Sequence, residues 1–393
     1  MKDQHSSLLR QRVTSGKPVA APMAQAAVKE AASDTKSPVR SEGYLNAKGH
    51  NGQINRVYYS VPKGQAATQN ALYFVGDYVD GDGDALIERL NTGEGVAATL
   101  LPKLDPGSNL FIVYPSMYQD RIWACYTSML PATSRTGEPL GFDGKDPMAA
   151  RQLGALLQDA LRQISAFPEG TQGGNEEASA NNEAGRSAAG LPVGHTETSV
   201  PGVSAPSASA LPTFVMGFSK GGVVLNEILA EIAALEDRRP ASGASGRESN
   251  TVGKVRSYTS SSGGAKSSGE GFSGAEAFLE SITEVHYVDV GLICPGAYLT
   301  DPQKLSNVVR RGARNPLTIG LHGTPRQWEE RRRPWIGEEK DRMLATLRAE
   351  AAAAGANSGF EVFERGYCEG GKVGMRMHFE IVDLADFGRP GPA

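Results

Sequence analysis

The stretch VMGFSKGGVVLNEIL, residues 215–229, decides how the chain is expected to fold. It places Ser219 between Gly217 and Gly221, after apolar residues that favour a strand and before apolar residues at helical spacing. A Gly-x-Ser-x-Gly run between a strand and a helix predicts a sharp, strained turn that lifts the serine hydroxyl above the edge of a sheet. The alternative interpretation is a serine in an ordinary tight bend.

Short apolar runs alternate with amphipathic segments along the rest of the chain. We expect strands within 69–77, 108–116, 211–219, 282–291, 315–324 and 359–371, and helices within 83–93, 146–167, 220–237 and 337–355. The helix at 83–93 is expected to stop at Gly93, because glycine commonly ends a helix. Alternating strands and helices predict a mostly parallel sheet covered by helices on both faces. Together with the turn at Ser219, this order predicts an α/β-hydrolase fold.

Three segments have a composition typical of disorder. Residues 1–45, about 169–210 and about 238–274 are rich in small and polar residues and bury too little apolar surface to offset the entropy of ordering. Long surface insertions cost little, because loop-closure entropy grows only logarithmically with loop length. We therefore expect a disordered extension over 1–45 and a single domain over 46–393, interrupted by the other two segments.

The bulk composition excludes several classes of function. With 40 basic and 44 acidic residues the formal net charge is -4, which does not favour a nucleic-acid partner. No apolar run reaches the length of about 18 residues that predicts a membrane-spanning helix. The three cysteines include no CxxC pair, so neither a zinc cluster nor a disulfide framework is expected. Residues 1–12 lack the apolar core of a secretory signal and match a mitochondrial presequence only weakly, which favours a cytoplasmic location on these residues alone.

A serine at such a turn needs a histidine to accept its proton before it can act as a nucleophile. His378 has the expected place, because it follows the last strand and precedes residues that could form a closing helix. Its alternative role is that of a structural histidine packed on an apolar face. The carboxylate that would orient the histidine is open between Asp289, at the end of a strand, and Glu330, beyond the next strand.

A developing oxyanion would be held by backbone N–H groups. One donor would be Lys220, which follows the serine at the start of a helix. The second would come from the loop after the strand at 69–77, where Gly76, Asp77 and Tyr78 are the candidates. An ordinary Gly-Asp turn is the alternative for this loop.

Several separated blocks resemble the chromosome 2 open reading frame 69 family of α/β-hydrolase-like proteins. They are YFVGD (73–77), YPSMY (114–118), ACYTSM (124–129), GFSKGGVVLNEIL (217–229), HYVDVG (286–291), HGTPRQW (322–328), RRPWIGEE (332–339) and MHFEIVDL (377–384). The resemblance covers most of the chain from about 55 to 388, apart from the two insertions. It implies a serine-hydrolase-like fold, a mitochondrial association and no settled substrate.

Carried over by position, the resemblance makes Ser219 the nucleophile, His378 the base and Asp289 the strand-end aspartate of the family. The chain departs from the family in two places. DVGL stands where a DGGH type of run is expected, and Glu330 stands where an aspartate is expected. Both departures bear on which carboxylate orients the histidine.

The sequence therefore predicts a serine hydrolase of the esterase or lipase type, which acts through an acyl-enzyme on Ser219. The expected ligand is a small-molecule ester or acyl substrate, and neither a metal nor an organic cofactor is implied. The alternative, from another class of function, is a catalytically silent α/β-hydrolase scaffold that binds a protein partner or a metabolite. The fold alone cannot separate the two, because function depends on the site.

Overall fold

The computed structural model describes residues 38–166, 211–239, 272–355 and 358–388. The expected insertion at 169–210, most of the one at 238–274 and residues 1–37 of the expected N-terminal extension lie outside these ranges.

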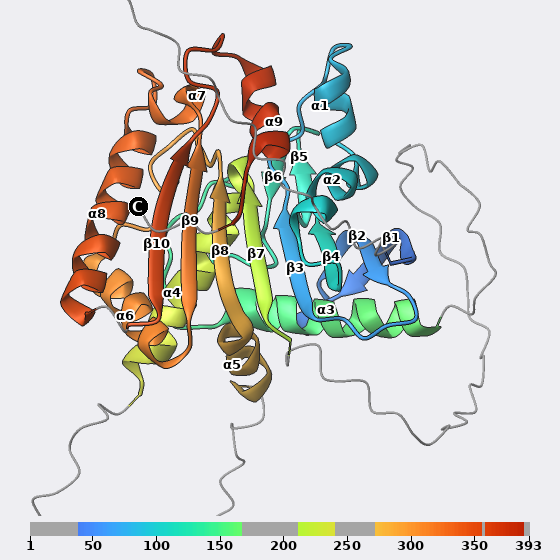
Figure 1. Ribbon diagram of the computed structural model, residues 1–393, viewed down its shortest axis with the longest axis horizontal. Coiled ribbons are helices and arrows are strands. Elements are labelled where there is room, and N and C mark those ends of the chain that lie inside the picture. The colour runs from blue at the N-terminus through green and yellow to red at the C-terminus, as the bar shows by residue number, and fades with distance from the viewer. Residues whose placement is uncertain (1–37, 167–210, 240–271, 356–357, 389–393) are drawn as a thin grey trace, which may run out of the picture. The chain divides into compact units, whose positions relative to one another are not determined.

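The described residues form an eight-stranded, mostly parallel sheet (Figure 1). Its strands, in spatial order, are β1 (Arg40–Lys48), β2 (Ile54–Pro62), β4 (Ser108–Val113), β3 (Gln69–Phe74), β7 (Thr213–Phe218), β8 (Ile282–Val288), β9 (Leu317–Gly323) and β10 (Phe360–Gly366). The second strand of this order, β2, runs antiparallel to both neighbours, and every pair from β4 to β10 is parallel. Beside the sheet, β5 (Met117–Gln119) and β6 (Trp123–Cys125) form an antiparallel hairpin.

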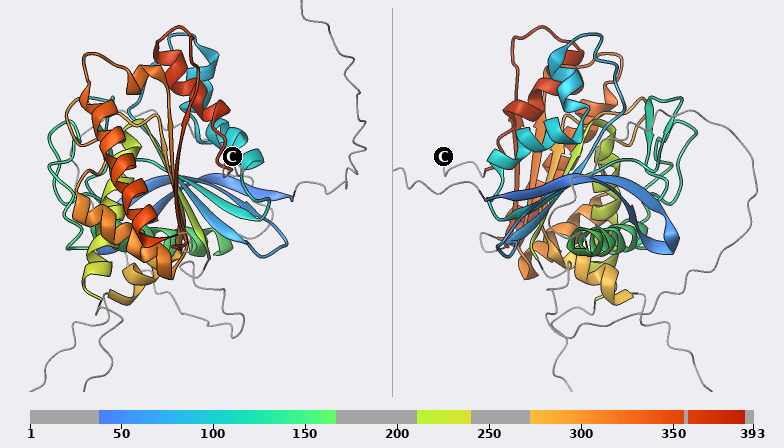
Figure 2. Two further views of the ribbon diagram at one scale, coloured as in Figure 1. Left: turned by 60° about the vertical axis from the view of Figure 1, so that its left-hand side comes forward. Right: turned by 90° about the vertical axis from the view of Figure 1, so that its right-hand side faces the viewer.

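Helices cover both faces of this sheet (Figure 2). One face carries α3 (Met148–Ala166), α4 (Gly222–Asp237), α5 (Phe272–Ser281), α6 (Pro302–Arg314) and α8 (Trp335–Ala354), which share one apolar core. The other carries α1 (Ala85–Leu90), α2 (Gly93–Leu100) and α9 (Met375–Leu384), which share a second core. The short helix α7 (Pro325–Trp328) follows β9. The strand order and the two helical layers are those of an α/β-hydrolase fold, and the predicted fold class is confirmed.

The sequence predicted that a helix ends at Gly93, and the structure shows that this is wrong. Helix α1 ends at Leu90, and Gly93 is the first residue of α2, which is capped by the Thr92 side chain accepting from the Gly95 N–H. A Cβ at position 93 would lie 2.5 Å from the Tyr58 Cβ. Glycine is therefore present because the helix approaches β2 closely, and this contact is invisible in the local sequence.

The folded domain also begins earlier than expected. Residues 40–45, assigned above to the disordered extension, belong to β1, which pairs along its whole length with β2. Of the nine residues of β1 only Leu45 and Ala47 are buried. This edge strand has too few apolar residues to show the alternating pattern that predicts a strand.

Candidate active site

Ser219 lies on the turn between β7 and α4, as the sequence predicted. Its backbone adopts a left-handed φ of 52°, a conformation that is strained for a residue with a side chain. A Cβ at Gly217 would lie 2.8 Å from the Gly221 carbonyl oxygen, and one at Gly221 would overlap the Phe74 carbonyl oxygen. Both glycines are thus required by the close approach of strand, turn and helix. The side chain of Ser219 remains 9% exposed.

A buried carboxylate and a histidine meet beside this turn. Asp289 follows β8 with a left-handed φ of 46° and is fully buried. Its Oδ2 lies 2.6 Å from His378 Nδ1. Its Oδ1 accepts hydrogen bonds from the Thr324 N–H at 2.7 Å and from the Thr324 hydroxyl at 3.0 Å. Thr324 was not singled out from the sequence, although it directly follows β9 and holds the carboxylate in place.

His378 lies within α9 rather than before a closing helix. Its ring stacks on Phe218, the residue that precedes Ser219, with 4.6 Å between the ring centroids. Since Nδ1 is bonded to Asp289, Nε2 is the ring nitrogen left for another partner. Within the described ranges the Ser219 hydroxyl makes no hydrogen bond, so the Ser219–His378 contact is not formed in this structure. Such contacts often tighten only when substrate binds.

The structure does not bring Glu330 to His378. The Glu330 carboxylate accepts the Arg332 N–H at 3.0 Å, and this bond, with nearby arginines, lowers the pKa of the carboxyl group. Of the two carboxylates that the sequence left open, only Asp289 is bonded to the histidine.

The loop after β3 touches the serine. A Cβ at Gly76 would lie 2.5 Å from the Ser219 Cβ and 3.0 Å from its Oγ. The Tyr78 N–H donates to the Ile122 carbonyl oxygen at 2.8 Å, so Tyr78 is removed from the candidate oxyanion donors. Gly76 and Asp77 donate to no acceptor within the described residues, and their N–H groups remain candidates.

The side chain of Lys220 has a role that the sequence analysis missed, because only its backbone N–H was considered. It is 1% exposed, and its Nζ lies 3.0 Å from Asp77 Oδ1 and 3.1 Å from Glu138 Oε1. Burial raises the pKa of both carboxyl groups, while the Lys220 charge opposes the increase. Nζ also donates to the Thr136 carbonyl oxygen at 2.9 Å. The lysine thereby joins the serine turn to the loop that carries Gly76 and Asp77.

Neither a metal centre nor a membrane span is apparent in the part of the chain that the structure describes. No group of three or more His, Cys, Asp or Glu side chains there could hold a metal ion. No helix of the same residues has the length and apolar character needed to cross a bilayer.

The chain was compared with known proteins. No family model matches it, and no curated protein does. Among solved structures, poly(aspartic acid) hydrolase-1 from Sphingomonas sp. KT-1 has 12% identity, covers 90% of this chain and 100% of its own, and gives a TM-score of 0.39. Dienelactone hydrolase from Anabaena variabilis has 12% identity, coverage of 88% and 95%, and a TM-score of 0.36. Carboxyl esterase 2 from Tuber melanosporum has 10% identity, coverage of 90% and 83%, and a TM-score of 0.35.

These similarities say nothing of the substrate of this chain. Because the TM-scores lie below 0.5, the assignment of the fold rests on the strand order and on the turn at Ser219. The class that fold and turn define is that of the α/β-hydrolase-like proteins.

Proposed function

We propose that this protein is a serine hydrolase that cleaves ester bonds through an acyl-enzyme on Ser219. The observation that carries the proposal is the 2.6 Å bond between His378 Nδ1 and Asp289 Oδ2, made beside a serine held in a left-handed conformation. The buried carboxylate fixes the ring so that Nε2 is free to accept a proton, and it stabilises the imidazolium that forms.

In the proposed reaction the Ser219 oxygen attacks the acyl carbon while His378 Nε2 takes the hydroxyl proton. The bond to the leaving alcohol then breaks, and the alcohol departs with that proton. Water attacks the acyl-enzyme in the second half, with His378 again accepting a proton and returning it to the Ser219 oxygen. The N–H groups of Lys220 and of Gly76 or Asp77 would stabilise the oxyanion in both halves.

Labelling with a fluorophosphonate probe tests the proposal. We expect the wild-type chain to label and the Ser219→Ala and His378→Ala variants to lose labelling while keeping their folded circular dichroism spectra. Ser306→Ala is the matched control, because Ser306 lies in α6 and its hydroxyl donates a hydrogen bond to Glu350 of α8. A folded wild type that the probe never labels would refute the proposal.

The alternative is a catalytically silent scaffold that binds a protein or a metabolite. One observation favours it, namely that the Ser219 hydroxyl makes no hydrogen bond to His378 within the described ranges. The labelling experiment separates the two. In a scaffold, Ser219 would not be labelled at any probe concentration too low to label an unactivated serine such as Ser306.

A further inference from the structure

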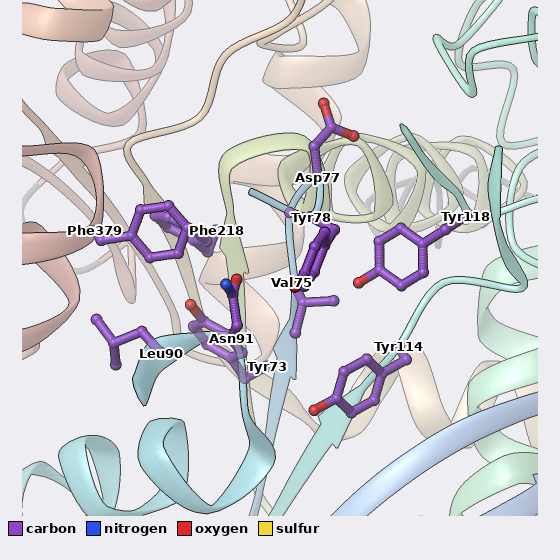
Figure 3. A pocket seen from close by; sticks show the side chains of 11 residues that line it. Tyr73, Val75, Asp77, Tyr78, Leu90, Asn91, Tyr114, Tyr118, Phe218 and Phe379 are labelled. Atoms are coloured by element: carbon purple, nitrogen blue, oxygen red, sulfur yellow. The ribbon is translucent and has the colours of Figure 1, made fainter. Parts of the chain in front are cut away.

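A pocket lined in part by residues of α1 and α9 lies next to the candidate nucleophile. Figure 3 shows the side chains that line it. Its walls include Gly76, which touches Ser219, and Phe218 and Phe379, which flank Ser219 and His378 in the sequence. Tyr118 lies on the opposite side from the two phenylalanines (Figure 3). A group bound here would lie beside the carbonyl that Ser219 attacks.

The hydroxyls of two tyrosines in this pocket, Tyr73 and Tyr118, are removed from bulk solvent and have no protein partner within the described residues. Tyr73 is 2% exposed, and within the described residues its hydroxyl makes no hydrogen bond. The Tyr118 hydroxyl also makes none there. Burial raises the pKa of both phenols, so both stay protonated and can donate. Buried hydroxyls in native proteins nearly always have a partner, which here must be water or a ligand.

The charge of the pocket argues against an ionic ligand. Asp77 is its one carboxylate, and that carboxylate is already bonded to Lys220 Nζ at 3.0 Å and to the Ala124 N–H at 2.7 Å. A second cation would compete with Lys220 for it, and an anion would be repelled. The guanidinium of the exposed Arg56 lies over the Tyr44 ring at 4.2 Å and over the ring of Tyr114, a pocket residue, at 5.5 Å, so it is already held by two aromatic rings.

A plain hydrocarbon chain also fits poorly. It would displace water from the Tyr73 hydroxyl and leave that donor without a hydrogen bond. Binding sites with buried hydroxyl donors reject ligands that lack polar atoms for this reason. The aromatic walls still favour a ligand with apolar contact surface.

We propose that this pocket binds an uncharged, oxygen-bearing part of an ester substrate, with Tyr73 and Tyr118 as hydrogen-bond donors to its oxygen. The proposal rests on the proposed function, and it makes this protein an esterase for polar substrates rather than for lipid-like acyl chains. Tyr73 and Tyr118 are then specificity-determining residues.

Two pairs of isosteric esters test it, in which an ether oxygen replaces a methylene group. One pair is nitrophenyl methoxyacetate and nitrophenyl butyrate, and the other is methoxyethyl acetate and butyl acetate. After division of kcat/KM by the rate of hydroxide-catalysed hydrolysis, we expect the wild type to prefer the ether in at least one pair by about tenfold. Tyr73→Phe and Tyr118→Phe should each reduce this preference, and the double variant should abolish it.

Tyr59→Phe is the control, because Tyr59 belongs to the core on the other face of the sheet. A wild type that prefers the methylene esters, or a preference that survives in the folded double variant, would overturn the proposal.

A second measurement does not depend on turnover. In Ser219→Ala, labelled with carbon-13 in its tyrosines, methoxyethyl acetate should shift the Tyr73 and Tyr118 resonances more strongly than butyl acetate. Equal shifts, or none with either ester, would count against the pocket even if the wild type labels with fluorophosphonate. If the wild type is not labelled by fluorophosphonate but the tyrosine resonances shift selectively, the hydrolase proposal is refuted and the binding role of the pocket is retained.

Discussion

Lys220 Nζ lies 3.0 Å from Asp77 Oδ1, so the residue after the candidate nucleophile is tied to the loop after β3. The backbone N–H groups of these same two residues are candidate oxyanion donors. The ion pair therefore fixes the spacing between the segments that carry these candidate donors. Donors must be placed in advance to stabilise charge that develops only in the transition state.

Replacing Lys220 by methionine is expected to slow acylation. Without the ammonium group the loop at Asp77 loses its link to the turn, and we expect kcat to fall by about ten- to a hundredfold with a smaller change in KM. The change also leaves two carboxylates without their cation and should lower the free energy of unfolding by about 3 kcal/mol. Steady-state kinetics and urea unfolding measure the two effects.

Lys304→Met is the matched control, because Lys304 forms a half-buried ion pair with Asp301 within one helical turn. It should change neither kcat nor the labelling rate. A Lys220→Met protein that is folded and retains full kcat would show that the pair does not position the oxyanion donors.

Asp289→Asn is expected to abolish most of the reactivity of Ser219. The amide cannot stabilise an imidazolium and can hold His378 in the wrong tautomer, so the fluorophosphonate labelling rate should fall by about three to four orders of magnitude. Glu330→Gln is the control and should leave the rate unchanged, because Glu330 is bonded to Arg332 and not to His378. The reverse pattern would identify Glu330 as the orienting carboxylate.

Gly76→Ala tests whether the loop after β3 serves the serine. The added methyl group would lie 2.5 Å from the Ser219 Cβ, so the loop or the serine must shift. Since small displacements of reacting groups cost about a hundredfold in rate, we expect kcat/KM to fall by that order while the fold persists. At Gly274 of α5 an added Cβ meets nothing within 4 Å, so Gly274→Ala should leave kcat/KM unchanged. Equal activity of the two variants would contradict a role for Gly76.

The sequence predicted the parallel core of the sheet and the turn at Ser219 because their signals are local. Buried strands read as apolar runs, and Gly217 and Gly221 mark the close approach of strand and helix. The sequence did not decide whether Asp289 or Glu330 orients His378, because the distance from His378 to each carboxylate depends on how distant segments pack. Asp289 and His378, for example, are 89 residues apart in the chain. The contacts of the Lys220 side chain with Asp77 and Glu138 were missed for the same reason.

The pH dependence of stability should reveal a buried histidine pair. His286 Nδ1 lies 3.0 Å from His322 Nε2, and His322 Nδ1 lies 2.9 Å from the Tyr367 hydroxyl. Both rings are fully buried, and burial lowers the pKa of each below its ordinary value of 6.5. The folded protein therefore keeps both rings neutral to a lower pH than the unfolded chain, which protonates them as the pH falls below about 6.5.

It follows that the stability from these neutral rings is complete above pH 6.5 or so and is lost as the pH falls toward their folded pKa values. The loss should reach about 1.4 kcal/mol per pH unit for each histidine. Urea unfolding between about pH 7.5 and 5 should show that the stability of the wild type relative to His286→Phe/His322→Phe decreases as the pH falls. Glu227, whose pKa burial raises to about 7, acts in the opposite direction but is common to both proteins and cancels in the difference. His50→Gln should retain the wild-type slope, and an identical slope in the double variant would mean that the pair does not control acid stability.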